Sequence, residues 1–586
     1  MAFNIGDQID YNINNQKDFF NKKKQHKSIW DDHSLLRIFV AIIIPTTIIT
    51  FMSALYVFID ELLLTRLVPL SNTFENMITG AGTSYNDYID YVDKLNNAGL
   101  NVYLTKYSTT LIVRNAITYF APLALIIVAF SQFVFSGSSL YFAKVNGKII
   151  NNNAGQAWCT SFYFVLIIYV IFAGIFSVAL NSILHFEHGD PYAELMKGQD
   201  LIFQACNKTG LDFNTVFLCL QKVYSKASDL TMLYSKEYGY IVIGGLILML
   251  YSSLLSGLLI AEGRSVNIII AIVVSNTINI FLDWILIYYA HMAVIGSAVA
   301  TLIGYVINNL WFFIYIKVLN KRNMTNLHYS DLNLKKHNFK LHALKRIFFF
   351  GLSSLVRNLC DTFMNFLLLF IFSSILIKII GDGGTTADGY TNFYGAILLI
   401  ESLFLSLVSG MIHGARIMIA HYYGLKDFER LRKSFAISQF FVALLSIWFA
   451  LVIVFNKYFL MIFNIHESTI ASTLLILVII KDIVYIFCMG PNILFQAIGQ
   501  TVRSNIAAMT YNLICFVPVS FIMFGISIVT KQEIIYLASP LASIVVSWFV
   551  WNIWISIFYN KYLTLTSYDN KVIWMKNKGY FKPKTK

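Results

Sequence analysis

Residues 265–290 read SVNIIIAIVVSNTINIFLDWILIYYA, an apolar run that carries a single charged side chain, Asp283. The run is long enough to cross a hydrocarbon core of about 30 Å as an α-helix, which takes about 20 residues. Asn279 lies four positions before Asp283, so the two side chains share one helix face. Ionisable residues inside a membrane are rare and usually face a cavity. The stretch therefore predicts a membrane-spanning helix with a functional polar face.

The whole chain has the composition of a membrane protein. Its 586 residues are 57% hydrophobic and only 13% charged, whereas soluble domains carry about 25% charged residues. The apolar blocks predict twelve spanning helices, because backbone polar groups in lipid have to be hydrogen-bonded within the segment. We expect these helices at residues 37–68, 111–140, 157–185, 239–261, 265–290, 293–318, 343–377, 391–420, 434–456, 469–495, 504–529 and 534–559.

Basic residues gather in alternate loops of this predicted topology. With the N-terminus in the cytoplasm, the cytoplasmic loops hold most of the Lys and Arg, while the opposite loops are mixed or acidic, as in NDYIDYVDK (86–94). This positive-inside pattern predicts a multi-pass protein of the cell membrane with both termini cytoplasmic. The net charge of +13 then reflects topology, and we expect no nucleic-acid partner.

An internal repeat links the two halves of the chain. SGSSLYFAKVNGK (136–148) and HGARIMIAHYYGLK (413–426) share Gly, Ala and Gly at identical spacing, and AEGRSV (261–266) resembles AIGQTV (497–502). Two landmarks in the same order predict a duplicated six-helix unit. The fold class is therefore an all-α integral membrane protein with two six-helix, pseudo-symmetric lobes around a central cavity, an arrangement that suits a transporter.

The predicted organisation follows from this repeat. It consists of a cytoplasmic N-terminal segment (1–36), an N-lobe (37–318), a cytoplasmic linker (319–342), a C-lobe (343–560) and a basic cytoplasmic tail (561–586). The N-lobe includes two long outer loops, at about 70–110 and 186–236, which are candidates for small external caps. Cys206 and Cys219 lie in the second of these loops, and the sequence is compatible with a disulfide or with two free thiols.

The first half of the chain offers a set of oxygen ligands inside its spans. Asp60 and Asp283 are acidic, Asn279 lies one turn before Asp283, and Thr301 is on the next span. Hard oxygen ligands of this kind suit a small cation such as Na⁺, and two close carboxylates that repel each other favour uptake of a proton. The alternative is structural, with Asp283 accepting hydrogen bonds from Asn279 or Thr301 inside the bundle.

The second half mixes charges of both signs. Arg357 and Asp361 are four positions apart and predict an ion pair, with a structural role and a role in substrate binding equally expected; Glu401 is a further candidate for either role. Lys481 and Asp482 are adjacent, so we expect their side chains to point in different directions. His413 and His421 are expected at the membrane interface.

Signatures of soluble catalysis are absent from the sequence. It contains no G-x-x-x-x-G-K-[ST], H-E-x-x-H or G-x-S-x-G motif, which are the phosphate-binding, zinc-binding and nucleophile motifs of common enzymes. We therefore expect a protein that is not an enzyme, that uses no cofactor, and that takes its energy from an ion gradient.

Several stretches resemble the multidrug and toxic compound extrusion (MATE) transporters of the MOP flippase superfamily. LLSGLLIAEGRSVNIIIAIVVSNTINIFLDWILIYYAHMAVIGSAVATLIGYV (254–306) resembles the fourth-to-sixth helix region of that family, with its N-x-x-x-D and its G-x-A-x-A-T. IIIPTTIITFMSALYVFIDELLLTRL (42–67) is similar to the first helix, with an early Pro and a later Asp. GLSSLVRNLCDTFMNF (351–366) and IHGARIMIAHYYGLKDFERLRKS (412–434) resemble the seventh helix and the end of the eighth.

The resemblance implies a function and a site. It implies a monomer embedded in membrane lipid that exports amphipathic or cationic organic compounds, such as drugs and toxic metabolites, by antiport with Na⁺ or H⁺. Its coupling cation would bind Asp60, Asn279, Asp283 and Thr301, which are also the Na⁺ ligands if the ion is sodium. Arg357, Lys481 and the outer loops depart from the family pattern. They leave open an alternative, a lipid or lipid-linked glycan flippase of the same superfamily.

Overall fold

The computed structural model describes residues 34–67, 73–98, 104–146, 154–188, 195–196, 198–333, 339–372, 387–425, 427–461 and 469–558. The predicted basic tail (561–586) and residues 1–33 of the predicted N-terminal segment lie outside this set. Within the described residues the regular secondary structure is entirely helical, which confirms the predicted fold class.

Six spans form the N-lobe at the predicted positions. They are α2 (Leu35–Leu67), α5 (Thr109–Asn146), α6 (Ala154–His188), α9 (Phe213–Ala261), α10 (Ser265–Asp283) continued by the π-helical segment η3 (Trp284–Tyr289), and α11 (Ala293–Lys321). The main difference from prediction is α9, which begins well before residue 239. Its outer half is too polar to be recognised as a span, but it packs against other helices of the outer loops.

The C-lobe spans are more interrupted than their N-lobe counterparts. They are α12 (Leu341–Ile371), α14 (Ala387–Leu425), α15 (Phe428–Leu444) with α16 (Ser446–Val454), α18 (Thr469–Cys488) with α19 (Gly490–Ile498), α20 (Thr501–Met509) with η7 (Thr510–Cys515) and α21 (Phe516–Thr530), and α23 (Ser539–Phe558). Short helices α17 (Asn456–Met461) and α22 (Glu533–Leu537) lie between them. Pro491 near the start of α19 explains one break, since Pro lacks an amide donor.

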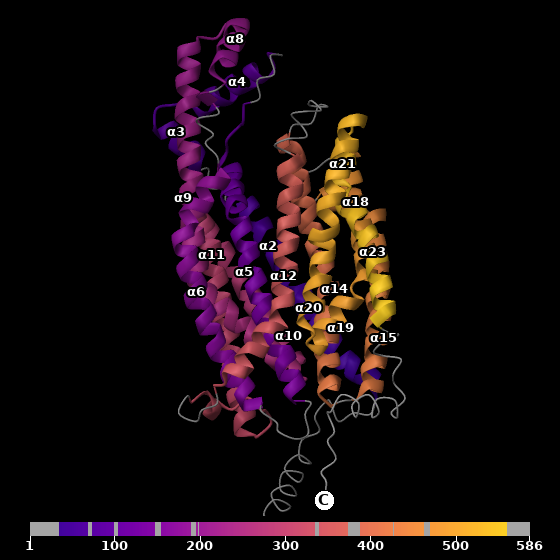
Figure 1. The fold of residues 1–586 in the computed structure, drawn as a ribbon. Helices are drawn as coiled ribbons and strands as arrows, with labels where there is room; N and C mark the ends of the chain where they lie inside the picture. Colours follow the sequence, from indigo (N-terminus) through magenta and orange to yellow (C-terminus); the bar gives the residue numbers. More distant parts are fainter. Residues whose placement is uncertain are drawn as a thin grey trace, which may run out of the picture.

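Ten of the described helices are long and apolar enough to cross a membrane. The other two predicted spans are α12, which carries Arg357 and Asp361, and α23, whose described apolar stretch Ser539–Trp551 is short. Polar residues thus lower the apparent hydropathy of α12, although it lies parallel to its neighbours in the bundle (Figure 1).

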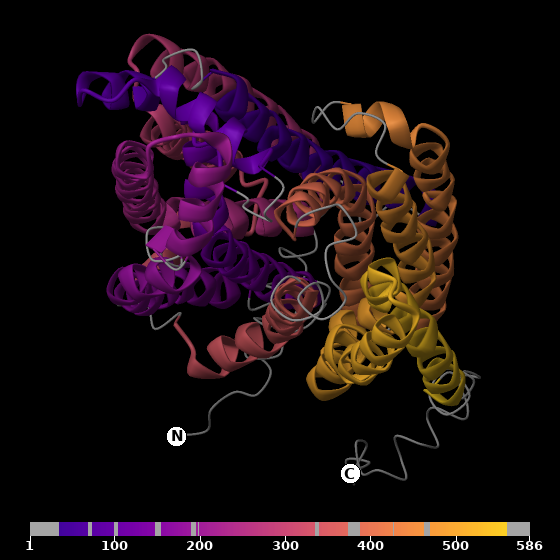
Figure 2. The ribbon, with the colours of Figure 1, turned by 90° about the horizontal axis from the view of Figure 1, so that it is seen from above.

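The two lobes lie side by side, with the N-lobe in indigo to magenta and the C-lobe in orange to yellow (Figure 1, Figure 2). We call the end of the bundle at which α5 ends and α6 begins the inner end, because the basic loops predict it to be cytoplasmic. Between the lobes, α2 packs on α14, and α5 packs on α12 and α14.

The glycines of the sequence repeat lie at this interface. A Cβ added to Gly414 of α14 would lie 2.5 Å from Thr46 Oγ1 of α2, and one added to Gly137 of α5 would lie 2.5 Å from the Ile347 carbonyl oxygen of α12. Both glycines therefore permit helix contacts that no larger residue fits. Because both contacts lie in the inner halves of their helices, the lobes are joined at the inner end.

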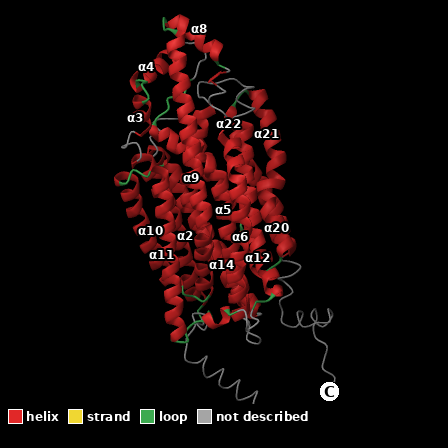
Figure 3. Ribbon diagram, turned by 90° about the vertical axis from the view of Figure 1, so that its left-hand side faces the viewer, coloured by secondary structure: helices red, strands yellow, loops and turns green. Residues whose placement is uncertain are grey.

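The outer loops form a helical cap on the N-lobe alone (Figure 1, Figure 3). It consists of α3 (Thr73–Gly80), α4 (Tyr85–Asn96), α8 (Gln199–Thr209) and the outer half of α9. These helices enclose a hydrophobic core of their own, which includes Phe74, Tyr88 and Leu220. Cys206 and Cys219 are buried in that core as free thiols, so the structure has the second of the two arrangements that the sequence left open.

Candidate functional site

The N-lobe brings Asp60 of α2 beside Asp283 of α10. Helix α2 packs on α10, and α10 packs on α11. The last contact is close because Gly304 of α11 faces Asn279, where a Cβ would lie 3.3 Å from the Asn279 Cβ. Asp60 and Asp283 lie within electrostatic range of each other.

Hydroxyl groups surround this acid pair. Ser297 Oγ of α11 donates a hydrogen bond to Asp60 Oδ1 at 2.9 Å. One turn further along α11, Thr301 Oγ1 lies 2.6 Å from the Tyr56 hydroxyl of α2, and either oxygen can donate. Tyr56 is itself within electrostatic range of both carboxylates. The site is thus built from three neighbouring helices, and α2 supplies two of its side chains.

In the described part of the chain, Asp283 and Asn279 have no hydrogen-bond partners for their side chains. Asp283 is fully buried and Asn279 is 2% exposed. Among the described residues, no hydrogen-bond partner contacts either carboxylate oxygen of Asp283 or either amide atom of Asn279. The structural alternative, in which Asn279 or Thr301 donates to Asp283, is therefore not what the structure has. Two adjacent carboxylates of this kind need a cation or a proton between them.

Sequence reasoning missed Ser297 and Tyr56. Ser297 precedes Thr301 by four residues and Tyr56 precedes Asp60 by four residues. Each pair therefore shares a helix face. Both could have been predicted as polar side chains that lie four positions before residues already selected.

The C-lobe contains a second polar cluster, centred on Lys481 of α18. Its Nζ lies 2.5 Å from Glu401 Oε1 of α14 and 3.2 Å from Asp482 Oδ1. The contact with Asp482 is close but lacks hydrogen-bond geometry, since both Asp482 oxygens have no hydrogen-bond partner among the described residues. The expectation that Lys481 and Asp482 point in different directions is therefore wrong. Glu401 belongs to a buried ion pair.

The predicted ion pair between Arg357 and Asp361 is not formed. Arg357 Nη2 instead makes a long hydrogen bond of 3.4 Å to Ser354 Oγ. Helical side chains lean toward the N-terminus of their helix. Arg357 follows this direction, toward Ser354 and away from Asp361. Asp361 remains within electrostatic range of both Arg357 and Lys481.

The histidines of α14 are buried against other helices, and their position at the membrane interface stays a prediction. His413 is 6% exposed and His421 is 4% exposed, and the His413 ring packs edge-on against Phe135 of α5, with 5.0 Å between ring centroids. Arg416, between them, is 1% exposed. Arg416 was not among the residues for which the sequence predicts a role.

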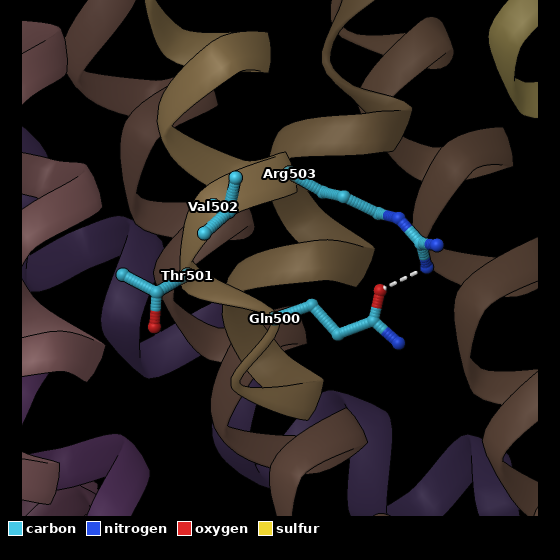
Figure 4. A pocket seen from close by; sticks show the side chains of 4 residues that line it. All are labelled: Gln500, Thr501, Val502 and Arg503. Carbon is cyan, nitrogen blue, oxygen red and sulfur yellow. Dashed lines mark hydrogen bonds between the residues drawn. The ribbon is translucent and has the colours of Figure 1, made fainter.

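A surface pocket lies at the turn between α19 and α20. Gln500, Thr501, Val502 and Arg503 line it, and its volume is about 380 Å³ (Figure 4). Arg503 Nη1 donates to Gln500 Oε1 at 2.5 Å across one side of it. None of these residues belongs to either intramembrane polar cluster.

Comparison with known proteins identifies the fold and a family match over part of the chain. The MatE family model matches residues 354–526. The whole architecture is similar to the outward-facing conformation of a multidrug resistance MATE family transporter of the MOP superfamily, with a TM-score of 0.63, 18% identity, and coverage of 89% of this chain and 96% of that one. The chain therefore has the fold of MATE transporters. Together with the ten described helices of spanning length and composition, this fold identifies a multi-pass membrane protein.

Other relatives are similar to this chain over most of its length. Uncharacterized protein MG447 homolog MYCGA2290 of Mycoplasmoides gallisepticum is 26% identical over 87% of either chain. Uncharacterized protein MG447 of Mycoplasma genitalium is 25% identical, over 89% of this chain and 91% of its own length. A MOP superfamily transporter from Pyrococcus furiosus, whose binding-pocket polarity is described as reversed and suggestive of a different function, has a TM-score of 0.60 at 18% identity, with 89% and 96% coverage.

Proposed function

We propose that this protein is a MATE-type secondary transporter that moves amphipathic organic compounds out of the cell in exchange for Na⁺ or H⁺. The observation that carries the proposal is the buried, unpaired Asp283 next to Asp60. We place both termini in the cytoplasm, as the basic loops favour. In this proposal the protein acts as a monomer, catalyses no chemical reaction and needs no cofactor besides the coupling ion.

Helix α2 offers a route from ion binding to lobe movement. Its outer half carries Asp60, while in its inner half Thr50 Oγ1 donates to the Ser406 carbonyl oxygen of α14 at 2.7 Å. A cation bound at the acid pair would draw Asp60 and Asp283 together and so bias the position of α2. Because α2 also contacts the C-lobe, the ion would favour one arrangement of the lobes over the other.

A lipid or lipid-linked glycan flippase is the second candidate. It is favoured by two arginines of the C-lobe, the half-buried Arg357 and the buried Arg416, which do not suit a purely cationic substrate. The Pyrococcus furiosus neighbour with a binding pocket of reverse polarity is a precedent for such a difference within the superfamily. Both candidates share the same coupling site in the N-lobe.

The proposal is tested with purified protein in liposomes. An imposed Na⁺ or H⁺ gradient, varied separately, should drive movement of a fluorescent amphipathic cation or of a fluorescent phospholipid. We expect Asp283→Asn to lower the gradient-driven rate at least 100-fold, because one coupling carboxylate is lost. The matched control is Asp90→Asn on the exposed face of the cap, which should transport at the wild-type rate. Equal rates for wild type and Asp283→Asn would overturn the proposal.

A further inference from the structure

Arg416 of α14 is a buried cation with no partner. Its side chain is 1% exposed, and among the described residues none accepts a hydrogen bond from Nε, Nη1 or Nη2. An arginine carries five N–H donors and stays charged in proteins. Burial of such a group without a counter-charge costs several kcal/mol. Arg416 therefore needs a counter-charge that the described side chains do not supply.

A second guanidinium lies close to the first. Arg357 of α12 is within electrostatic range of Arg416, and so is the Tyr485 hydroxyl of α18. Arg357 Nη1 also has no hydrogen-bond partner among the described residues. Helices α12 and α14 both pack on α5 and on α19, so the two arginines lie on helices that share the same neighbours. Like charges within electrostatic range repel each other unless an anion lies between them.

The acidic residues of the C-lobe do not neutralise Arg416. Glu401 is bonded to Lys481, and Asp482 is also next to Lys481. Asp361 lies within range of Lys481 and Arg357 but makes no ion pair with either arginine. The C-lobe interior thus divides into an acidic group around Lys481 and a basic group around Arg416.

Neutral polar residues surround the basic group. His413 is within electrostatic range of both arginines, and Gln496 of α19 donates from Nε2 to Ser354 Oγ at 2.7 Å, which leaves its own Oε1 unpaired. Ser354 in turn donates to Ser136 Oγ of α5 at 2.8 Å. The basic group therefore reaches the contact between the lobes. A ligand bound there would be sensitive to their separation.

We propose that Arg357 and Arg416, with His413 beside them, bind an oxyanion group, a phosphate or a carboxylate, of the transported amphiphile. The planar guanidinium fork matches such groups with two parallel hydrogen bonds, and two of them supply enough donors for a phosphate. This site deepens the proposed function, on which it rests, by defining the substrate as an amphiphile with an anionic head.

Binding to the full-length protein in an uncharged detergent tests the site. The probes are a fluorescently labelled phosphatidic acid, the equally labelled diacylglycerol, which lacks the phosphate, a labelled fatty acid, which carries a carboxylate, and inorganic phosphate as a competitor. We expect the two anionic lipids to bind at least tenfold more tightly than diacylglycerol, because each forms charge-assisted hydrogen bonds with the arginines. Equal binding of the anionic lipids and diacylglycerol would overturn the proposal.

Arg416→Met is the decisive variant, because it keeps the volume of the side chain while removing the charge. It should weaken phosphatidic acid binding about 10- to 100-fold, and Arg416→Lys, which keeps the charge but loses the fork, should lie between the two. The matched control is Arg503→Met at the α19–α20 turn, outside the cluster, with unchanged affinity. Wild-type affinity for phosphatidic acid in Arg416→Met would contradict the assignment. If the Met variant does not fold, wild-type affinity in Arg416→Lys would contradict it instead.

Inorganic phosphate separates the two sources of the oxyanion. Binding of phosphate without binding of the lipids would overturn the assignment to an amphiphile and identify the free ion as the ligand, while the absence of both would overturn the site altogether. The assay uses no ion gradient. A failure of ion coupling at Asp283 would therefore leave the binding results unchanged, which keeps the two proposals separable.

Discussion

The two lobes have the same helical plan but bury different charges. In the N-lobe, two carboxylates lie within electrostatic range of each other, and hydroxyls of Ser297, Thr301 and Tyr56 lie beside them. In the C-lobe, two guanidiniums lie within electrostatic range of each other, and among the described residues Arg416 has no hydrogen-bond partner. The glycines that join the lobes are nevertheless equivalent in the repeat: Gly137 faces α12 and Gly414 faces α2.

This comparison separates what the duplication preserves from what it does not. The contact surface between the lobes depends on small residues at fixed helix positions, so it is kept in both halves. The buried charges depend on what each lobe has to bind: the pair in the N-lobe is acidic, whereas the C-lobe holds a basic group as well as an acidic one. We infer that one lobe serves the coupling cation and the other serves the substrate.

The largest expected effect on stability comes from removing the buried charge of Lys481 in the C-lobe. Removal of the buried charge of Asp283 in the N-lobe is the comparison. Lys481→Met leaves Glu401 and Asp482 buried without a cation and should lower the free energy of unfolding by about 3–5 kcal/mol. Asp283→Asn removes one of two repelling carboxylates and should not lower stability in Na⁺-free buffer. Unfolding in detergent measures both changes.

An exposed lysine supplies the control for that comparison. Lys94→Met breaks a surface ion pair with Asp90 and should change the unfolding free energy by less than about 1 kcal/mol. A stable Lys481→Met together with an unstable Asp283→Asn would mean that the two interiors do not differ as described.

Much of this architecture could be predicted from the sequence. All twelve spans coincide with helices, since long apolar blocks in lipid have few alternatives. The outer half of α9 was missed, because it is polar and is held by the cap core rather than by lipid. The break before Gly490 and the Arg357 hydrogen bond to Ser354 depend on local backbone and rotamer choices that periodicity does not determine.

The candidate site shows the same limit. Asp60 and Asp283 were selected because charges in spans are rare, and that argument depends on single residues. Arg416 was not selected, and its burial depends on how α5, α18 and α19 pack around α14. Tertiary contacts of that kind are not encoded in a local pattern.

The repeat glycines provide the next test of the comparison. Gly137→Leu and Gly414→Leu should each push the lobes apart at the inner end, at about 1–3 kcal/mol for an overpacked contact. In a background without the native cysteines, Thr46→Cys serves as the reporter. We expect a polar thiol reagent to label it faster in each of these two variants than in the protein with both glycines. Gly174→Leu is the control, because no atom lies within 4 Å of its added Cβ. Slow labelling in either interface variant would argue against equivalent contacts.

A smaller effect is expected from Ser297→Ala. The variant loses the hydrogen bond to Asp60 Oδ1, which orients that carboxylate, and should weaken affinity for the coupling ion about tenfold. Stabilisation of the protein against heat at graded Na⁺ concentration or graded pH measures this affinity. Ser177→Ala is the control, since Ser177 only bonds the Ala173 carbonyl of its own helix. Unchanged ion affinity in Ser297→Ala would remove Ser297 from the site.

The smallest effect is expected from Tyr56→Phe, which removes one hydroxyl next to Thr301. Loss of a neutral hydrogen bond changes free energy by about 0.5–1.5 kcal/mol. We therefore expect a several-fold shift in the affinity for the coupling ion, with affinity for phosphatidic acid unchanged. A shift in lipid affinity instead would mean that the N-lobe site also contacts the substrate.

The central claim is that the coupling cation binds between Asp60 and Asp283. Direct binding of radioactive Na⁺ to the purified protein, together with measurement of the protons exchanged, tests it most directly. We predict one cation, Na⁺ or H⁺, at this pair in the wild type, and its loss in Asp283→Asn but not in Asp90→Asn. Cation binding of wild-type affinity and stoichiometry in Asp283→Asn would contradict the claim.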